Sequence, residues 1–247
     1  MIHIKSEEEI ELLREPCAIV RDCLSFVGER IRAGMTTKEV DALVYDFIKA
    51  SGAEPSCLGY YGFPASACVS VNEVVVHGIP DGRMIEEGDI VSVDLCAYKN
   101  GFHGDGARTF LIGKVSESRE KLVRVTEECF FKAIEHLKAG SPLYDIGYEV
   151  QRHAESNGFS VIRSYTGHGI GRDMHEDPSV PNFGRKGTGV RLPANTVLCI
   201  EPMIAEGGFR VEVLDDGWTA VMRDRKSAAH YENTVLVREN GVEILTL

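Results

Sequence analysis

The segment Glu87–Gly113 reads EGDIVSVDLCAYKNGFHGDGARTFLIG. Residues 90–98 have the composition of a β-strand, and Asn100-Gly101 is the strongest two-residue signal for a hairpin turn. With this turn as the loop, residues face each other when their numbers add to 201. Because side chains alternate along a strand, one face of the hairpin then carries Asp94, Cys96, Asp105 and Ala107.

Two carboxylates that lie as diagonal neighbours repel each other unless a cation or a shared proton lies between them. The alternative is an exposed strand face on which Asp94 and Asp105 simply meet water. The hairpin alone favours neither interpretation.

On both sides of the hairpin, the chain has the pattern of two helices followed by extended segments. Capping residues and glycine stops predict helices from Ser6 to about Arg32 and from Thr36 to Gly52. A second pair is predicted from about residue 118 to a break at Ala139-Gly140, and on to residue 157.

The two helical pairs are related by a constant offset of 106 residues. The residues that match at this offset are Ile31, Arg32, Ala33, Gly34, Val40, Val44 and Gly52 with Leu137, Lys138, Ala139, Gly140, Ile146, Val150 and Gly158. This register favours an internal duplication, with repeats of about 6–113 and 118–237 in one α+β domain over residues 1–247. A cleft between two such halves is a preferred place for a site.

The composition limits the class of protein. The 247 residues include 27 basic and 38 acidic side chains, for a net charge of −11, which argues against a sequence-independent nucleic-acid binder. The 43% hydrophobic content excludes a disordered, collagen-like or coiled-coil chain. The start of the chain lacks the apolar region of a secretory signal, and no stretch approaches the ~20 apolar residues of a membrane span. Seven scattered cysteines favour reduced thiols and a cytoplasmic location.

Further acids and histidines occur in glycine-rich or apolar surroundings. His168 lies between two glycines, Glu201 ends one apolar run, and Glu232 begins another. A lone histidine is usually an ordinary core or surface residue, but an unpaired buried carboxylate costs several kcal/mol. Together with Asp94 and Asp105, these residues offer four carboxylates and one imidazole. Such a set suits Mn, Fe, Co or Zn, and its charge matches two divalent ions about 3.5–4 Å apart.

The chain resembles the methionine aminopeptidases, in particular their short bacterial-type (type I) branch. The resemblance extends from about Ile4 to Val242. The motifs that carry it are Gly62–Pro80, Gly88–Phe110, Gly167–Pro178, Glu201-Pro202-Met203 and Tyr231–Thr234. It implies the pita-bread fold, in which two pseudo-symmetric halves surround a curved antiparallel sheet. It also implies two divalent ions and removal of the N-terminal methionine before a small second residue.

The family's five metal ligands correspond here to Asp94, Asp105, His168, Glu201 and Glu232. The resemblance implies that Asp94 binds one ion, that His168 and Glu201 hold the other, and that the remaining two acids bridge. The resemblance also implies that metal coordination would activate a water for attack on the peptide bond, and that Glu201 would carry its proton to the leaving amine.

Two further histidines correspond to the family's non-ligand histidines. His175 would polarise the scissile carbonyl, and His77 would contact the peptide nitrogen or the leaving side. The alternative for His175 is a capping or solvent role, whereas His77 has no obvious packing task.

The methionine pocket corresponds to an apolar, aromatic set of residues, which suits a thioether side chain. Its members are Cys57, Tyr60, Phe63, Cys68, Met174 and Trp218. All six could equally be plain core residues, and for Cys68 and Phe63 this is the stronger interpretation when each is taken alone.

Several positions depart from the family's usual pattern. Met174 replaces a common Phe, Cys96 a Thr, Gly106-Ala107 a hydroxyl pair, and Asn233 a His. These departures remove no ligand. They leave the substrate range and the metal preference open.

Other members of the fold and other classes of protein fit this sequence less well. Proline-directed relatives share the five ligands but usually carry a large N-terminal domain, and only 76 residues precede His77. The type II branch inserts a subdomain between its His and Glu ligands, where only residues 169–200 lie here. A binding protein that has lost catalysis typically loses ligands, which this chain retains. A thiol enzyme based on Cys68 or Cys96 lacks an adjacent base.

The expected partners follow from the resemblance. They are N-terminal peptides and nascent chains, with a transient contact to the ribosome. No DNA or membrane partner is expected, and the chain is expected to be a monomer.

Overall fold

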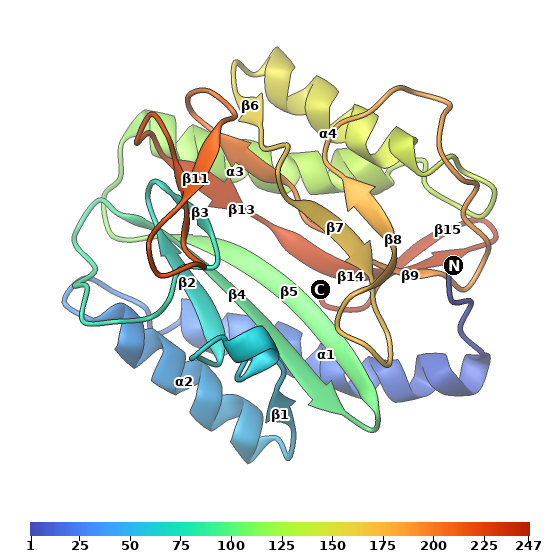
Figure 1. Ribbon diagram of the computed structural model, residues 1–247, viewed down its shortest axis with the longest axis horizontal. Helices are drawn as coiled ribbons and strands as arrows, with labels where there is room; N and C mark the ends of the chain where they lie inside the picture. Colours follow the sequence, from blue (N-terminus) through green and yellow to red (C-terminus); the bar gives the residue numbers. More distant parts are fainter.

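In the computed structural model, which describes residues 1–247, the predicted hairpin lies near the middle of a nine-stranded sheet (Figure 1). Strand β4 (Ile90–Lys99) pairs antiparallel with β5 (Phe102–Leu111). Asp94 faces Ala107 and Cys96 faces Asp105, so the register predicted from the Asn-Gly turn is confirmed.

The long sheet has the strand order β1-β4-β5-β14-β9-β7-β8, with β2 on β4 and β15 on β14, and its pairs are antiparallel. Its other strands are β1 (Glu54–Pro55), β2 (Ala67–Val71), β7 (Thr166–Gly169), β8 (Glu176–Pro181), β9 (Val197–Ile200), β14 (Glu232–Arg238) and β15 (Gly241–Ile244). There are also two three-stranded sheets. One contains β6 (Ser160–Val161), β10 (Met203–Ala205) and β13 (Ala228–His230). The other contains β3 (Val74–Val76), β11 (Val211–Val213) and β12 (Ala220–Met222).

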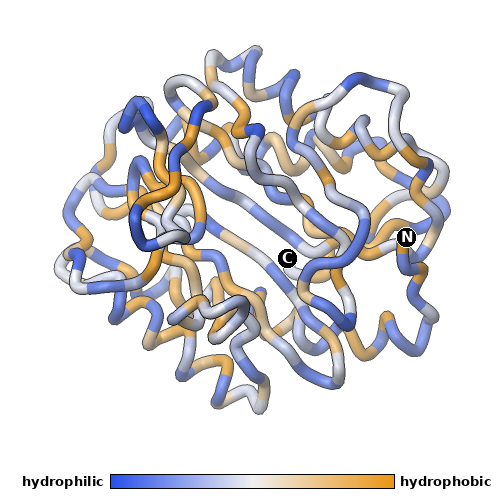
Figure 2. The backbone as a smooth tube through the Cα atoms, in the orientation of Figure 1, coloured by the Kyte–Doolittle hydropathy of each residue, from blue (hydrophilic) through white to orange (hydrophobic).

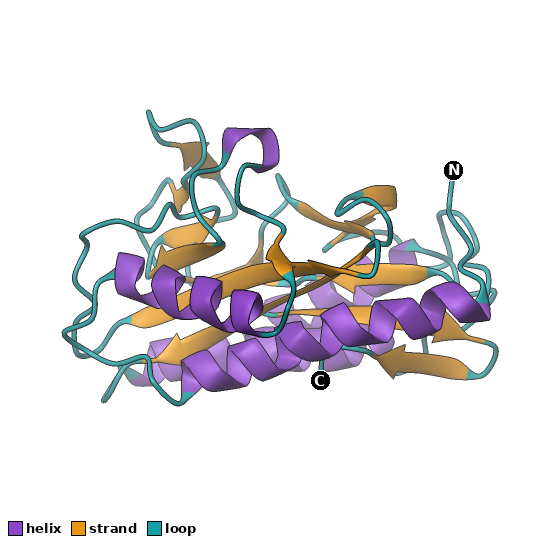
Figure 3. Cartoon of the chain, turned by 90° about the horizontal axis from the view of Figure 1, so that it is seen from below, coloured by secondary structure: helices purple, strands orange, loops and turns teal.

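Four helices lie along one side of the sheet, and the short turn η1 (Tyr60–Gly62) lies on the other side (Figure 3). The helices are α1 (Glu7–Gly28), α2 (Thr37–Ala50), α3 (Glu117–Ile134) and α4 (Tyr144–Ser156). Apolar and polar residues alternate along them, as in helices packed against a sheet (Figure 2). None of the helices combines the length and the apolar character needed to cross a membrane.

The helix starts follow the predicted caps, since Ser6 and Thr36 both form capping boxes. Helix α1 ends at Gly28, earlier than predicted, because the following chain turns to pair with another segment, where the Gly34 N–H donates to the carbonyl of Ile85 at 2.9 Å. Helix α3 begins at Glu117 because Ser116 is its N-cap, while the Ser118 hydroxyl bonds to Glu206 instead.

Helix α3 also ends before its predicted stop, at Ile134. The chain after it is held by tertiary hydrogen bonds, with the Ala139 N–H donating to the Arg238 carbonyl at 2.9 Å and the Gly140 N–H to the Leu192 carbonyl at 2.8 Å. Hydrogen bonds to distant segments therefore end the helix before its sequence pattern ends.

The core has two main parts. One consists of 18 buried residues from α1, α2 and the strands above them, and the other of 22 residues centred on α3, α4, β9 and β14. Close packing of α1 on β5 depends on Gly104, where a Cβ atom would lie 2.6 Å from the Cys17 backbone nitrogen. The α+β class is thus confirmed, whereas the internal duplication stays a prediction.

Candidate metal centre

The strand register brings the predicted ligands onto one face of the long sheet. Ala107 of β5 faces Asp94 of β4 on one side and Glu232 of β14 on the other. On the neighbouring strands, Cys199 of β9 faces His168 of β7. Glu201 follows β9 directly, two residues after Cys199. Because side chains alternate along a strand, these residues point to the same side.

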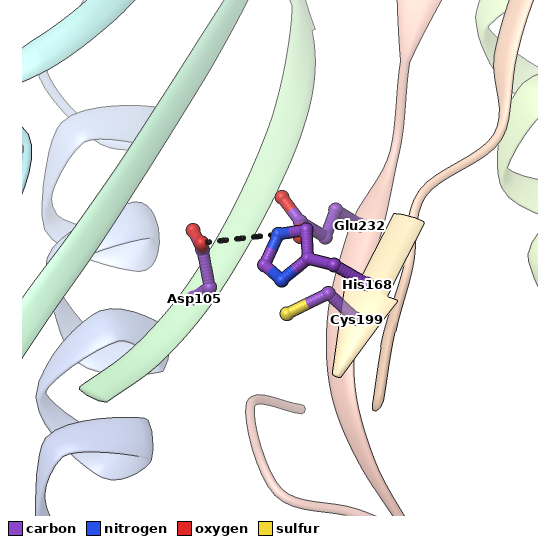
Figure 4. Close-up of side chains that lie close together, drawn as sticks. All are labelled: Asp105, His168, Cys199 and Glu232. Carbon is purple, nitrogen blue, oxygen red and sulfur yellow. Dashed lines mark ion pairs between the residues drawn. The ribbon is translucent and has the colours of Figure 1, made fainter. Parts of the chain in front are cut away.

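The side chains meet in a tight cluster. His168 Nε2 lies 3.9 Å from Asp105 Oδ2 and 3.6 Å from Glu201 Oε1. Donor atoms of Asp105, His168, Cys199 and Glu232 all lie within 4.8 Å of one another (Figure 4). Cys199 was not predicted as a site residue.

Burial makes the carboxylates of this cluster hard to ionise. It raises the pKa of Asp94 to about 7. It also raises the pKa values of Asp105, Glu201 and Glu232, with a further increase from the neighbouring acids. Burial lowers the pKa of His168 to about 3, so the imidazole is neutral and cannot compensate the negative charge. The cluster is therefore suited to bind cations.

The individual donor atoms also suit metal ions. His168 Nδ1 lies 2.9 Å from the Gly169 carbonyl, which can only accept a hydrogen bond, so Nδ1 carries the proton and Nε2 keeps its lone pair. Glu232 Oε1 is buried and has no hydrogen-bond partner. Carboxylate and imidazole donors of this kind fit divalent first-row ions.

The cluster forms one wall of a cavity of about 360 Å³. The cavity is lined by the five predicted ligands, by both predicted histidines, and by all six predicted pocket residues, namely Cys57, Tyr60, Phe63, Cys68, Met174 and Trp218. The structure thus brings together every residue that the sequence singled out for the site.

At the cluster end of the cavity, His175 lies against His168, with the ring centroids 4.2 Å apart. Its Nδ1 is 2.7 Å from the hydroxyl of Tyr60 in η1. Burial lowers the pKa of His175, so the ring is neutral near pH 7. The phenol and the imidazole hold each other at the edge of the metal cluster.

At the apolar end, Phe63 and Cys68 are buried in a small cluster against which Cys57 and Trp218 pack. The rings of Phe63 and Trp218 meet edge to face at 5.2 Å. Met174 is also buried, with 6% of its surface exposed. These residues therefore pack as core residues and line the cavity at the same time.

His77 follows β3 with a φ of +58°, a left-handed conformation that is unusual for a residue with a side chain. Its ring meets Tyr165 edge to face at 5.3 Å and lines the cavity. Strain of this kind persists only where the surrounding structure fixes it, and it is common at functional sites.

Several cavity residues were not predicted: Tyr61, Val76, Ser164, Tyr165, Thr166 and Met203. Most of them adjoin a recognised motif, but no residue-level signal distinguishes them from ordinary neighbours. The buried His230 was also missed, although its Nε2 lies 3.9 Å from Glu201 Oε2 and has no hydrogen-bond partner.

The departures from the family pattern that lie in strands are divided between the two faces of the sheet. Cys96 and Ala107 share the face of the cluster. Gly106 points toward α1, where a Cβ would lie 3.0 Å from Val20, so helix packing accounts for this glycine. Asn233 also points away from the cluster and accepts a hydrogen bond from Arg108 at 2.7 Å.

Several known proteins match this chain over nearly its whole length. The sequence model that describes metallopeptidase family M24 matches residues 11–239. A methionine aminopeptidase of Clostridium perfringens is 53% identical over 247 residues, which is all of this chain and 99% of the relative. The crystal structure of methionine aminopeptidase from Thermotoga maritima matches with a TM-score of 0.98 and 47% identity, over 100% of this chain and 99% of that chain. A prolidase from Pyrococcus furiosus matches with a TM-score of 0.81 and 25% identity, over 99% of this chain and 65% of the prolidase.

Proposed function

The chain belongs to metallopeptidase family M24 and, within it, to the methionine aminopeptidases, and from this membership we propose that it removes the N-terminal methionine of peptides and nascent proteins. It is a metal-dependent aminopeptidase with the pita-bread fold. The single observation that supports the proposed site best is the cavity that joins the carboxylate cluster to an apolar, aromatic pocket.

The proline-directed alternative has weaker support. The prolidase shares the fold, but this chain covers only 65% of its length. The methionine aminopeptidases match over essentially their whole length and at higher identity. A non-catalytic binding protein is disfavoured because all five predicted ligands are present and lie together.

The proposed cofactors are two divalent ions chosen among Co, Mn, Fe and Zn. Asp94 would hold one ion, His168 and Glu201 the other, and Asp105 and Glu232 would contact both. When bound, the ions supply Lewis acidity and a water of lowered pKa at the peptide bond. The four carboxylates, of which Asp105 and Glu232 are buried and Asp94 and Glu201 half-buried, and the unpartnered Glu232 oxygen support this assignment.

The proposed catalytic residues act beside the cluster. Glu201 takes a proton from the attacking water and delivers it to the leaving amine. The Tyr60 hydroxyl donates to His175 Nδ1, which leaves the Nε2–H of His175 free to hydrogen bond to the scissile carbonyl oxygen. His77, on the same cavity, contacts the peptide nitrogen or the leaving side.

The methionine side chain would occupy the apolar end of the cavity. Cys57, Tyr60, Phe63, Cys68, Met174 and Trp218 form this pocket in the proposal. Thiol and aromatic groups suit an unbranched thioether, because sulfur–ring contacts add to apolar burial. The preference for a small second residue belongs to the same proposal.

The remaining assignments concern the setting of the enzyme. The 247 residues are proposed to form one catalytic domain, supported by the continuous nine-stranded sheet that joins both helical pairs. A cytoplasmic location is supported by seven unpaired cysteines. A transient ribosome contact would present nascent chains. A monomer is proposed.

The test is release of free methionine from a Met-Ala-Ser peptide, with a Leu-Ala-Ser peptide as the matched control. Both are assayed with Mn²⁺, Co²⁺ or Fe²⁺ and with a chelator. Metal-dependent cleavage confined to the methionine peptide is expected. Cleavage of both peptides contradicts the pocket assignment, and no cleavage by folded, metal-loaded protein contradicts the proposed activity.

A further inference from the structure

Cys199 is a thiol inside the carboxylate cluster that the proposed mechanism does not use. Its Sγ lies within 4.8 Å of donor atoms from Asp105, His168 and Glu232. Figure 4 shows these four side chains turned toward one another from separate strands. We propose that Cys199 is an additional ligand on the His168 side of the cluster, and that it makes this position prefer a soft ion such as Zn²⁺ or Cd²⁺ over Mn²⁺. This inference rests on the proposed function and concerns its choice of metal.

The position of the thiol is fixed by the sheet. Cys199 faces His168 across the β7–β9 pair and Thr234 across the β9–β14 pair. Glu201 follows two residues later and therefore points to the same side. The Cys199 side chain is fully buried, so its sulfur is not in solvent, and it also packs against an apolar group of residues that includes Ile10 and Cys17 of α1.

Few hydrogen-bonding groups lie beside this sulfur. They are the Glu232 carboxylate and the Thr234 hydroxyl, which is 3.8 Å away and so near the limit for a contact to sulfur. That hydroxyl already donates to the Asp105 carbonyl at 2.8 Å and accepts from the Asp105 N–H at 3.1 Å. The adjacent Glu232 Oε1 is buried without any partner, which independently indicates that a cation belongs here.

The chemistry of the four donors favours a borderline or soft ion. Thiolate and imidazole are typical zinc ligands, whereas an all-oxygen set suits manganese. Donors of a tetrahedral zinc are separated from one another by about 3.4–3.8 Å. Small side-chain rotations would bring the four donor atoms, which lie within 4.8 Å of one another, to these distances. On coordination, the thiol proton is released to solvent and the sulfur–metal bond replaces the sulfur–hydrogen bond.

Cobalt(II) is the spectroscopic probe, because a thiolate ligand gives it an intense near-ultraviolet charge-transfer absorption. We compare the full chain with Cys199→Ser, and with Cys129→Ser and Cys96→Ser as controls. Cys129 is buried and bonds to the Val150 carbonyl, outside the cluster. The absorption is expected in the wild type and both controls and is expected to be lost in Cys199→Ser. The affinity ratio of Cd²⁺ to Mn²⁺ should also fall about tenfold or more in that variant.

Retention of the absorption in Cys199→Ser, or an unchanged ratio of Cd²⁺ to Mn²⁺ affinity, overturns the proposal. If this variant does not fold, X-ray absorption of the Zn²⁺-loaded wild type decides. A sulfur neighbour at about 2.3 Å supports the proposal, and only nitrogen and oxygen neighbours at about 2.0–2.2 Å overturn it. Methionine release by the Mn²⁺-loaded wild type tests the proposed function separately. Release without a sulfur ligand rejects only the inference about Cys199, and a sulfur ligand without release rejects only the proposed function.

Discussion

Lys5 and Glu176 form an ion pair across 171 residues of sequence, with Lys5 Nζ 2.5 Å from Glu176 Oε2 and only 4% and 6% of their side chains exposed. Glu176 also accepts a hydrogen bond from the Arg172 N–H at 2.9 Å. Because Glu176 directly follows His175, the pair fastens the N-terminal segment to the loop that carries Met174 and His175. The N-terminal segment therefore helps to hold one wall of the cavity.

Replacement of Lys5 by Ala leaves the Glu176 carboxylate buried without its cation. We expect this variant to lose about 3–5 kcal/mol in the free energy of unfolding, and its kcat to fall because the His175 loop loosens. Urea unfolding and steady-state kinetics measure both effects. Lys5→Arg should restore most of each loss, and Lys132→Ala, which breaks the exposed pair with Glu135, should cost less than about 1 kcal/mol. An unchanged kcat in Lys5→Ala would limit the ion pair to a stabilising role.

Glu201→Gln keeps the size of the side chain but removes its ability to carry a proton. We expect kcat to fall about 10²–10⁴-fold while the circular dichroism spectrum stays that of the wild type. His175→Ala should lower kcat in the same direction, by about 10²–10³-fold, because a donor to the carbonyl oxygen is lost. The exposed Glu239 offers the matched control Glu239→Gln, which should keep full activity. Wild-type turnover in either site variant, with metal loaded, is incompatible with the assigned roles.

Met174 is a flexible wall of the proposed methionine pocket. Met174→Phe should make this wall stiffer and raise the preference for methionine over leucine and norleucine, since an aromatic ring adapts less to other shapes. The ratio of kcat/KM for the three N-terminal residues measures this selectivity. Met84→Phe, at an exposed position that does not line the cavity, is the control. Equal ratios in Met174→Phe and the wild type would remove Met174 from the determinants of specificity.

Much of the fold could be predicted from local signals. The register of Asp94 against Ala107 followed from the Asn100-Gly101 turn, because a two-residue loop leaves one antiparallel pairing. The Ser6 and Thr36 capping boxes set helix starts for the same local reason. The ends of α1 and α3 were predicted too late, since distant segments compete there for backbone hydrogen bonds.

The site was predicted mainly through the family resemblance, and what the motifs did not contain was missed. Cys199 lies in the apolar run VLCI and has no feature that marks it as different from a core thiol. Its neighbours are set by the order β14-β9-β7, which joins segments distant in sequence. Lys5 and Glu176 likewise read as ordinary surface charges, because burial of both depends on where the N-terminal segment lies.

The metal-free protein should become less stable as the pH rises. The folded-state pKa of Asp94 is about 7, above its ordinary value of 3.8, so the folded state binds this proton more tightly than the unfolded state. The resulting stability is present below about pH 4 and is lost as the pH approaches 7. Asp105, Glu201 and Glu232 shift in the same direction.

Chelator-treated protein is therefore expected to melt at a lower temperature at about pH 8 than at about pH 5, and Mn²⁺ should raise the melting temperature more at the higher pH. Calorimetry measures both differences, and Asp94→Asn should reduce the pH dependence. A metal-free protein that is equally stable at both pH values would show that the carboxylates are solvated rather than buried together.

Thr246, next to the C-terminal Leu247, supports the strand that carries Glu232. Its hydroxyl accepts a hydrogen bond from the Thr234 N–H and donates to Asn233 Oδ1, both at 3.0 Å. Arg108 joins the same network by donating to Asn233 Oδ1 at 2.7 Å and to the Glu232 carbonyl at 2.6 Å. Asn233, a departure from the family pattern, is thus part of the support behind the cluster.

Thr246→Val keeps the shape of this side chain but removes both of its hydrogen bonds, which leaves the buried Thr234 N–H unpaired. We expect a loss of about 1–3 kcal/mol in the free energy of unfolding of the metal-free protein. Because Thr234 also holds the backbone of Asp105, the Kd for Mn²⁺ should rise about 10–100-fold. Urea unfolding and titration calorimetry measure the two effects, and Thr246→Ser, which restores the hydroxyl, is the control. A destabilised Thr246→Val variant with an unchanged Kd would show that the C-terminus stabilises the fold without positioning the ligands.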